Sequence, residues 1–401
     1  MSCLKTDFLI VGAGIVGLNL AISLKSKYPD ATIMIIEKEK QPAFHASGRN
    51  TGVLHAGFYY TPDSVKAKFC REGNKHLTNY CLERSLPINQ CGKLVVTKDN
   101  RDLKVLDELI KRGKENHVEL IELDDNDVKD IEPNVYTYQK ALFSPNTSTV
   151  DPRKIINALI NDLIDQKIEL KTDTAFIARK GNLILSSKGY IETGYLVNAA
   201  GLYADKIAMM YGFSENYRIL PFKGIYLHAD DKVFNLNTNV YPVPNLENPF
   251  LGVHYTLDVS GKIKIGPTAI PAFWREQYSG LENFIFSEFI EIFLREVGLF
   301  LFNHFDFRKL AFEELKKYSK KSIVNEAKKM VPSLSSKKVS EWGKPGIRAQ
   351  LINLIERKLE MDFIFEGDNQ SFHVLNAVSP AFTCSKPLAD FLVEKISENL
   401  S

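Results

Sequence analysis

The stretch Asp7–Leu20, DFLIVGAGIVGLNL, decides the fold of the first part of this chain. After Asp7, the next four residues form an apolar run, which is typical of a strand buried on both faces. Glycines then follow as Gly-x-Gly-x-x-Gly: Gly12 permits a tight turn, Gly14 lets a pyrophosphate approach the backbone, and Gly17 lets the next helix pack closely on the strand. The helix expected over 15–25 would direct its N–H groups and positive dipole end at the phosphates.

The residues that follow complete a nucleotide-binding unit. A second buried strand is expected over 31–36, and Glu37 at its end lies 20 residues beyond Gly17, where a carboxylate accepts hydrogen bonds from an adenosine ribose. Lys38 is counted with Glu37 as a cofactor contact. The alternative, glycines that serve only a tight strand–helix turn, does not account for the acid. The segment His45–His55, HASGRNTGVLH, resembles no generic helix or strand. Together these features predict a Rossmann-like domain that binds a dinucleotide, and we expect FAD with redox chemistry beside it.

Size and composition exclude several classes of protein. At 401 residues the chain exceeds the usual size of one domain, so we expect two domains. Its 51 basic and 49 acidic residues nearly balance, which implies neither nucleic acid nor an anionic surface as a partner. Five cysteines without a Cys-x-x-Cys pair argue against disulfides and a zinc site, and we expect no metal and a cytoplasmic location. Because the chain enters a strand at once and lacks a run of about 18 uncharged apolar residues, we expect no signal peptide and no membrane span.

The pattern along the chain predicts an α/β protein with discontinuous domains. We expect helices over 103–116 and 153–166, a hairpin over 183–193, an antiparallel sheet over 219–270 and helical structure over 284–321. The expected domains are a Rossmann-like FAD-binding domain over 1–88, 145–212 and 342–401, and an α+β substrate-binding domain, built on a mixed or antiparallel sheet, over 89–144 and 213–341. Phenylalanines recur along 284–312. Core packing against the substrate sheet is favoured for them, and a membrane-surface patch is the alternative.

Several blocks of sequence resemble one known group of flavoproteins. Gly12–Gly17, Glu37, the turn Gly48–Gly52 and the segment Asn198–Gly201 are similar to the D-amino-acid-oxidase-like FAD oxidoreductases. Further blocks resemble, more narrowly, the L-2-hydroxyglutarate oxidase/dehydrogenase family: His45–Tyr60, Pro221–Gly224, Tyr241–Pro244, Pro249–His254, Gly266–Ala269, Gly346–Gln350 and Asn376–Ala381. The resemblance covers essentially the whole chain in order. One departure is Lys223, which stands where that family usually has arginine and replaces a bidentate fork with a point charge.

The resemblance implies a set of substrate-side residues. His55 and His254 are the candidate bases, because histidine titrates near the working pH; His55 is implied on the flavin side and His254 on the substrate side. Arg348 is implied as the carboxylate clamp, Lys223 as the cation for a second carboxylate, and Tyr241 as a hydroxyl contact. Each has a plainer alternative: a core histidine, a surface arginine in an ion pair, a solvated lysine at a turn, and a tyrosine bonded for structural reasons.

The resemblance also implies cofactor contacts beyond the first strand and helix. Ser379 and Pro380 are expected to cap and begin a helix over 382–396, whose positive end would face the flavin pyrimidine, where reduction builds negative charge. Asp205 is left out, because it is expected to start a short helix instead. The complete additional set is Gly48, Arg49, Asn50, Thr51, Ala200, Gly201, Ser379, Pro380 and Ala381.

The implied function is FAD-dependent oxidation of a small L-2-hydroxy acid, with L-2-hydroxyglutarate going to 2-oxoglutarate. Hydride passes from Cα to flavin N5, a histidine takes the hydroxyl proton, and a quinone or oxygen takes the electrons. Peripheral contact with the inner face of a membrane is compatible with this function. Two alternatives stay open: another enzyme of the superfamily, such as an amino-acid or amine oxidase or a glycerol-3-phosphate dehydrogenase, and a flavin-binding protein without turnover.

Overall fold

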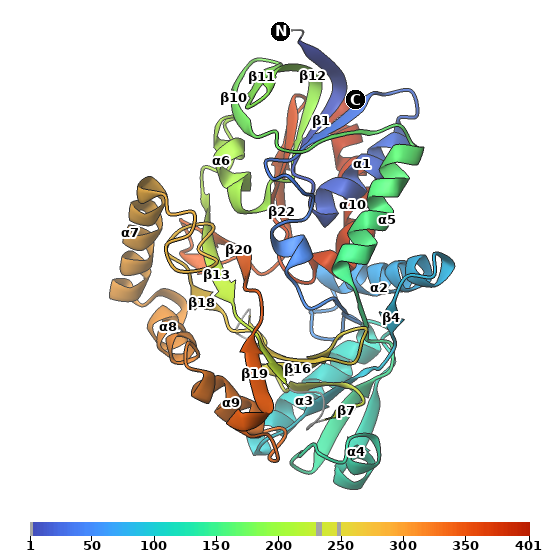
Figure 1. Ribbon diagram of the computed structural model, residues 1–401, viewed down its shortest axis with the longest axis vertical. Coiled ribbons are helices and arrows are strands. Elements are labelled where there is room, and N and C mark those ends of the chain that lie inside the picture. The colour runs from blue at the N-terminus through green and yellow to red at the C-terminus, as the bar shows by residue number, and fades with distance from the viewer. Residues whose placement is uncertain (1–2, 230–234, 247–249) are drawn as a thin grey trace. The chain divides into compact units, whose positions relative to one another are not determined.

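The computed structural model describes residues 3–229, 235–246 and 250–401, so Pro249 of the resembling blocks lies outside the described residues. Contacts divide the chain into two compact units, each assembled from separate segments (Figure 1). Unit 1 comprises 1–50, 152–220 and 349–401, and unit 2 comprises 51–151 and 221–348.

The elements of unit 1 alternate between strands and helices. Its strands are β1 (Leu4–Val11), β2 (Ile33–Ile36), β9 (Glu169–Lys171), β10 (Phe176–Lys180), β11 (Leu183–Ser186), β12 (Gly189–Asn198), β21 (Lys358–Leu359), β22 (Ile364–Gly367) and β23 (Ser371–Asn376). Its helices are α1 (Ile15–Lys27), α5 (Pro152–Asp165), α6 (Ala204–Met209) and α10 (Ala381–Leu400), with short 3-10 turns η1 (Ala46–Gly48) and η2 (Gly201–Tyr203). Two longer strands, β13 (Tyr217–Gly224) and β20 (Gly346–Asn353), carry the chain from one unit into the other.

A sheet with parallel central strands forms the middle of unit 1. The strand order is β10-β11-β12-β1-β2-β9, with β23 beside β12 and β22 beside β23. β1 runs parallel to both β12 and β2, so that Val11 is level with Asn198 on one side and Ile36 on the other. The carboxyl ends of these three strands therefore meet at one edge, which is where α/β sheets bind nucleotides. This confirms the predicted Rossmann-like class.

Helices α1 and α10 pack together against this sheet, and α5 lies beside α1 (Figure 1). Asn19 Nδ2 donates to Ser385 Oγ at 3.2 Å, and Ser23 Oγ donates to Asp390 Oδ1 at 2.7 Å, so polar contacts fix this helix pair as well as apolar ones. The predicted hairpin forms between β11 and β12, but its second strand runs on without a break to Asn198.

The described part of unit 2 contains twelve strands and six α-helices. Its strands are β3 (Val53–Leu54), β4 (Ile88–Asn89), β5 (Lys93–Val96), β6 (Ile121–Asp124), β7 (Lys140–Ser144), β8 (Ser148–Val150), β14 (Leu227–Ala229), β15 (Asn239–Pro242), β16 (His254–Leu257), β17 (Ile263–Gly266), β18 (Ile270–Pro271) and β19 (Val339–Trp342). Its helices are α2 (Val65–Glu83), α3 (Asn100–Glu115), α4 (Asp125–Ile131), α7 (Phe286–Phe302), α8 (Phe307–Lys316) and α9 (Lys320–Lys328).

The main sheet of unit 2 is mixed. Its order is β19-β14-β17-β16-β15-β5-β7-β6, and among the pairings of the described residues in this sheet only β15–β5 runs parallel. The pairings of β14, β15, β16 and β17 with one another are antiparallel, as predicted for the region 219–270. The parallel partner of β15 is β5, which comes from outside that region. β3 and β4 both pair with β8, which ties the start of unit 2 to residues 148–150.

The first boundary between the units differs from the expected one. Residues 51–88 were expected in the FAD-binding domain, whereas the contacts of β3, β4 and α2 place them in unit 2. The assignment of unit 1 to the cofactor and unit 2 to the substrate stays a prediction.

The two faces of the mixed sheet carry different side chains. Leu94, Val96, Val240 and Tyr255 point into an apolar core with α9, where the Tyr255 hydroxyl donates to Ala327 O at 2.9 Å. Val95 and Tyr241 point the other way, into a cluster that includes Phe58, Tyr59 and two leucines of α3. This second face carries polar side chains that a purely structural sheet would not need.

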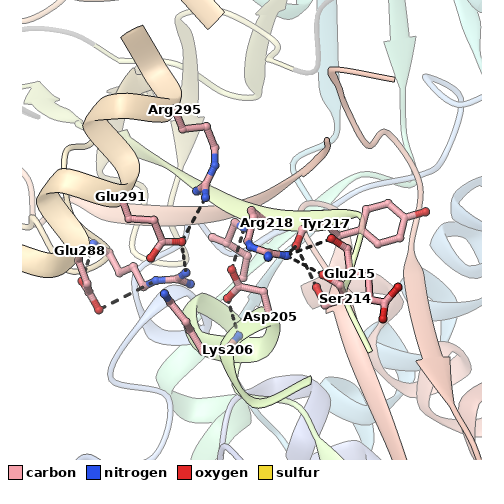
Figure 2. Close-up of polar contacts among 11 residues, drawn as sticks. Asp205, Lys206, Ser214, Glu215, Tyr217, Arg218, Glu288, Glu291 and Arg295 are labelled. Atoms are coloured by element: carbon pink, nitrogen blue, oxygen red, sulfur yellow. Dashed lines mark hydrogen bonds and ion pairs between the residues drawn. The ribbon is translucent and has the colours of Figure 1, made fainter. Parts of the chain in front are cut away.

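Helix α7 is amphipathic, but its charged side is buried and its apolar side is exposed. Glu288 and Glu296 are buried, at 8% and 6% exposure, whereas Phe286 and Leu294 are 68% and 62% exposed. Glu291 accepts a hydrogen bond from Arg295 at 3.1 Å, and Glu288 and Glu291 each lie 4.0 Å from the buried Arg275 (Figure 2). The charges of α7 are therefore held by contacts inside unit 2.

The phenylalanine stripe was expected to be mostly core, and for α7 this is wrong. Of the nine phenylalanines along 284–312, only Phe307 is buried, and six are exposed: Phe284, Phe286, Phe293, Phe300, Phe302 and Phe312. The reason is that the charged residues of α7, rather than its aromatic ones, face Arg275. None of the helices within the described ranges combines the length and apolar character needed to cross a bilayer.

Candidate active site

The glycine-rich turn between β1 and α1 is packed too tightly for any side chain. A Cβ on Gly12 would lie 2.6 Å from Ala199 O, and one on Gly17 would lie 2.0 Å from Gly12 O. Gly12 also has φ +107°, which L-residues rarely adopt. Gly14 precedes α1 in an extended conformation, so the first N–H groups of α1 open toward the sheet edge. These contacts explain the glycines at positions 12 and 17, whereas a Cβ on Gly14 would meet only Ser47 Oγ, at 3.1 Å.

Ser47, in the 3-10 turn η1, contacts the start of α1 and is a residue that the sequence analysis did not select. Its Oγ accepts a hydrogen bond from Ile15 N at 2.9 Å, at the very start of α1. A hydroxyl that accepts in this way still carries its own proton, which it can donate to an anion at the same helix end. The signal was present, because Ser47 lies inside the HASGRN segment, but no spacing rule points to it.

Glu37 ends β2 with both carboxylate oxygens directed at backbone N–H groups. Oε2 accepts from Ala13 N at 2.8 Å and Oε1 from Glu39 N at 3.0 Å. Each oxygen has a second lone pair, so the carboxylate can also accept from the hydroxyls of a ribose. Lys38 forms an ion pair with Glu39 and lies 5.4 Å from the centre of the Tyr203 ring, so its ammonium has partners within unit 1.

The loop 48–50 is held by its own side chains. A Cβ on Gly48 would lie 2.2 Å from Ala43 O. Arg49 Nε donates to Phe44 O at 2.9 Å, and Asn50 Nδ2 donates to Ser47 O at 2.8 Å. These bonds fix the shape of the loop, and direct contact of Arg49 and Asn50 with a cofactor stays a prediction. Thr51 is the first residue of unit 2, whereas the other predicted cofactor residues all lie in unit 1.

The end of β12 and the start of α10 supply the remaining cofactor candidates. Ala200 N donates to Asn198 Oδ1 at 3.2 Å, and Gly201 follows with φ +54° and open space around its Cβ position. Helix α10 begins at Ala381, with Pro380 in the capping position and no capping hydrogen bond from a described side chain. The expectation that Ser379 caps this helix is therefore wrong: the first helical bond runs from Cys384 N to Pro380 O, one residue later than a Ser379 cap requires.

Asp205 is structural, as its omission from the predicted site implied. Its Oδ2 accepts from Ile219 N at 3.0 Å and its Oδ1 from Lys206 N at 2.9 Å, at the start of α6 (Figure 2). The bond from Ile219 links α6 to the strand β13 within unit 1, and the bond from Lys206 lies within α6.

In unit 2, His254 and Tyr241 form one stacked pair on the second face of the mixed sheet. Their ring centres lie 3.8 Å apart with an angle of 17° between the planes. His254 Nδ1 lies 2.9 Å from Gly252 O, and because a carbonyl only accepts, Nδ1 carries the proton of the neutral ring. Burial lowers the pKa of His254 to about 3, so the ring is neutral at physiological pH and Nε2 keeps its lone pair.

His55 follows β3 and is held through its backbone. Its carbonyl accepts from Asn74 Nδ2 at 3.3 Å and from Cys70 Sγ at 3.1 Å, both on α2. Burial lowers the pKa of His55 well below its usual value, and the charges of Lys93, His254 and Arg348 act in the same direction. The two predicted histidines are thus electrostatic neighbours, together with Arg348.

Arg348 lies on β20 at the end of unit 2, with its guanidinium 5.0 Å from the centre of the Phe250 ring. Burial lowers its pKa, while Tyr226, Tyr60 and Glu314 act in the opposite direction. An arginine retains its charge even so, because its ordinary pKa is far above neutral. The structure therefore brings together four of the five predicted substrate-side residues: His55, His254, Tyr241 and Arg348.

Lys223 is the exception. Its Nζ donates to Tyr278 O at 3.5 Å and lies 5.9 Å from the centre of the Tyr318 ring. Within the described part of the chain, these contacts of Lys223 do not join it to the histidines or to Arg348. A different lysine, Lys93, lies in their neighbourhood and lowers the pKa of both His55 and His254. The sequence analysis missed it, although a lysine within the apolar strand KLVV has to be buried if the strand is covered on both faces.

Taken together, unit 1 offers a phosphate cradle with a ribose-binding acid, and unit 2 offers neutral histidines beside a fixed cation. The first arrangement fits a dinucleotide such as FAD: the glycines admit a pyrophosphate, the start of α1 favours its charge and Glu37 can accept from a ribose. The second arrangement can bind a carboxylate and remove a proton from a hydroxyl or amine beside it.

Comparison with known proteins gives a consistent result. Residues 7–394 match the family described as FAD dependent oxidoreductase (DAO). The mitochondrial L-2-hydroxyglutarate dehydrogenase of Nematostella vectensis is 33% identical over 98% of this chain and 91% of its own length, and that of Escherichia coli K12 is 33% identical over 98% and 94%. Among solved structures, the FAD-bound L-alpha-glycerophosphate oxidase of Mycoplasma pneumoniae superposes with a TM-score of 0.79 at 22% identity, covering 99% of this chain and 95% of that one.

These matches run through nearly the whole length of the chain and of its relatives, so they concern the complete fold rather than the nucleotide-binding motif alone. The protein is an enzyme that uses FAD. The chain therefore belongs to the family of FAD-dependent oxidoreductases, within which its sequence is similar to L-2-hydroxyglutarate dehydrogenases.

Proposed function

We propose that this enzyme oxidises L-2-hydroxyglutarate to 2-oxoglutarate. The observation that carries the proposal is the cluster in unit 2, where a neutral His254 with an unprotonated Nε2 shares an electrostatic neighbourhood with the guanidinium of Arg348. A 2-hydroxy acid needs this combination, because its carboxylate and its reacting hydroxyl are on adjacent carbons. The dehydrogenase names of relatives at 33% identity support the same substrate.

The cofactor side of the proposal rests on unit 1. Gly12, Gly14 and Gly17 would admit the pyrophosphate of FAD, and Glu37 would accept from its ribose. Bound FAD supplies the two-electron acceptor for the hydride that leaves the substrate. The N-terminus of α10, which begins at Ala381, would favour negative charge on the pyrimidine side of the flavin.

His254 is proposed as the base. Gly252 O fixes the proton on Nδ1, so the lone pair of Nε2 is the one available to take the hydroxyl proton. The stacking of His254 on Tyr241 fixes the plane of the ring and hence the direction of that lone pair. His55 is proposed to lie on the flavin side, held by α2 through its carbonyl.

Arg348 is proposed to hold the carboxylate beside the reacting carbon. A guanidinium donates two parallel hydrogen bonds to a carboxylate, which fixes the orientation of the substrate as well as binding it. The Phe250 ring beside the guanidinium restricts the motion of the Arg348 side chain. Less conformational entropy is therefore lost when the guanidinium binds the carboxylate.

The function is tested with purified, FAD-loaded protein and a dye as electron acceptor. L-2-hydroxyglutarate should be turned over in preference to glycerol 3-phosphate, N-methyl amino acids and D-2-hydroxyglutarate, with 2-oxoglutarate as the product. Turnover of one of the other compounds, without turnover of L-2-hydroxyglutarate, would replace the proposal with that activity. The Arg348→Ala variant is the control. It should turn over L-2-hydroxyglutarate poorly, because the proposed site needs the guanidinium to hold the substrate carboxylate.

We also propose that the enzyme contacts an anionic membrane surface through α7. The support is the outer apolar face, which we define as the exposed residues Phe286, Ile290, Phe293, Leu294, Leu301 and Phe302. An exposed apolar helix face of this kind is typical of helices that lie in a bilayer interface. The adjoining helices α8 and α9 contain six basic and three acidic residues, which favours an anionic bilayer. A quinone in that membrane would be the electron acceptor.

Membrane contact is tested by flotation with vesicles made of equal parts phosphatidylglycerol and phosphatidylcholine. Wild-type protein should float with these vesicles, and the Phe286→Ser/Leu294→Ser variant should not. The matched control is Ile164→Ser on α5, which removes an equally exposed apolar side chain outside the face. Wild-type protein that stays free of vesicles but elutes as a dimer would assign the face to a second copy of the chain instead.

A further inference from the structure

Lys93 is the most unusual charged residue of the described chain. It opens β5 and is 0% exposed. Its ammonium lies 4.6, 4.4 and 5.0 Å from the ring centres of Phe58, Tyr59 and Tyr241. Within the described residues, Lys93 Nζ has no hydrogen-bond partner, and the hydroxyl of Tyr59, also buried, has none either. Two unsatisfied polar groups of this kind, side by side, indicate a polar ligand that the chain itself does not provide.

The enclosure of Lys93 is energetically costly. A buried ammonium without an anion is far less stable than one in water, and aromatic rings recover only part of the difference. Burial accordingly lowers the pKa of Lys93 to about 7. An apolar residue of similar length would fill the space at lower cost, so a purely structural role does not explain a lysine here.

The position of Lys93 links it to the candidate active site. In the parallel pairing of β5 with β15, Lys93 is level with Asn239 and Val95 with Tyr241, which puts Lys93 on the sheet face of Tyr241. His254 stacks on that tyrosine. The charge of Lys93 lowers the pKa of both His254 and His55, so the ammonium acts on the groups proposed to meet the substrate.

We propose that Lys93, with the hydroxyl of Tyr59, binds the second carboxylate of a dicarboxylate substrate, the one remote from the reacting carbon. Arg348 would then hold the carboxylate beside that carbon. This inference rests on the proposed function, which it deepens by naming the residues that select a dicarboxylate over a monocarboxylate. It also reassigns the role that the resemblance implied for Lys223, whose Nζ donates to Tyr278 O.

The inference is tested by binding rather than turnover. Glutarate and pentanoate have the same five carbons, neither can be oxidised at a hydroxyl, and only glutarate has a second carboxylate. Their affinities for FAD-loaded protein are measured by isothermal titration calorimetry at about pH 6.5, where the ammonium of Lys93 is largely protonated. The ratio of the two dissociation constants isolates the contribution of the second carboxylate.

The matched variants are Lys93→Met and Lys223→Met, which remove a buried lysine each and keep a chain of similar length. Lys93→Met should weaken glutarate binding by between about 10-fold and 150-fold, the range for a hydrogen bond to a charged group, and leave pentanoate unchanged. Lys223→Met should keep the wild-type ratio. Tyr59→Phe, which removes one hydroxyl, should reduce the ratio by about 5-fold and serves if Lys93→Met fails to fold.

The inference would be overturned if the Lys93→Met and Tyr59→Phe variants both kept the wild-type ratio of the two dissociation constants. It would also be overturned if Lys223→Met were the only variant to lose the preference for glutarate. Wild-type protein without any preference for glutarate would overturn it as well. Failure of the proposed function has a different signature: the glutarate preference would depend on Lys93 as described, but L-2-hydroxyglutarate would not reduce the flavin. Unit 2 would then contain a dicarboxylate site that serves another reaction.

Discussion

Replacing Lys93 by methionine should make the protein more stable, and by an amount that depends on pH. The pKa of Lys93 falls from its ordinary value of 10.5 to about 7 because the ammonium is buried. Each factor of ten in the proton equilibrium corresponds to about 1.4 kcal/mol, so the buried charge costs on the order of 5 kcal/mol of folding free energy. Methionine fills the space among the three rings without this cost.

The direction of the pH effect follows from proton binding. Between about pH 7 and pH 10.5 the unfolded chain keeps the lysine proton while the folded chain releases it, so the stability of the wild type rises with pH across this window. The advantage of Lys93→Met is therefore full, about 5 kcal/mol, near pH 6 and falls to about 2 kcal/mol near pH 9.

The assay is urea unfolding of FAD-loaded wild type and variant at these two pH values, followed by circular dichroism. Lys140→Met is the control, because that lysine is exposed and its ion pair with Glu122 spans 3.6 Å at the surface, where such pairs contribute little. A Lys93→Met variant that is less stable than the wild type near pH 6, or whose advantage does not change with pH, would refute the reasoning. It would mean that the ammonium is already paired in the folded protein.

Three further predictions concern the site. Arg348→Ala should raise KM by about 10-fold to 150-fold with FAD still bound, because a charge-assisted pair is lost; steady-state kinetics and the flavin spectrum check this, and an unchanged KM removes Arg348 from the clamp. His254→Asn should lower the rate of flavin reduction by about 100-fold to 10,000-fold in stopped flow, and a wild-type rate would make His254 structural. Glu37→Ala should weaken FAD binding by at least about 10-fold, measured by flavin fluorescence, since Ala13 N and Glu39 N lose their acceptor; tight FAD binding would contradict the cradle.

The nucleotide-binding half of the fold was predictable because its rules are local. The distance from Gly12 to Glu37 is set by one helix and one strand, and the contacts of Gly12 and Gly17 explain why no other residue fits at those two positions. The membership of residues 51–88 in unit 2 was not predictable, because it depends on pairing of β3 and β4 with β8, about 60 to 100 residues away along the chain.

The substrate-side residues were reached by resemblance rather than by pattern. Nothing in the spacing of His55, His254 and Arg348 predicts that they are electrostatic neighbours, since they come from three separate segments. The resemblance also implied Lys223 as a substrate-side residue, but in the structure this lysine contacts Tyr278 and Tyr318 instead. Lys93 escaped notice because a lysine at the start of a strand normally reaches solvent, and only the enclosing rings of distant segments bury it.

Helix α7 illustrates the same limit in another way. Periodicity correctly indicated helical structure over 284–321, but it did not tell which face of the helix is turned inward. The orientation is decided by Arg275, a buried partner outside the helix that draws Glu288 and Glu291 toward it (Figure 2). The predicted cap of α10 was also wrong, because Pro380 rather than Ser379 precedes the first helical residue.

The most direct test of the central claim is reduction of the bound flavin by substrate without oxygen. FAD-loaded protein is mixed anaerobically with L-2-hydroxyglutarate or its D-isomer, and the visible flavin absorption is followed by stopped flow. The account predicts rapid bleaching with the L-isomer, formation of one 2-oxoglutarate per flavin and no bleaching with the D-isomer. A flavin that stays oxidised with L-2-hydroxyglutarate, or that both isomers bleach equally, would contradict the proposed reaction.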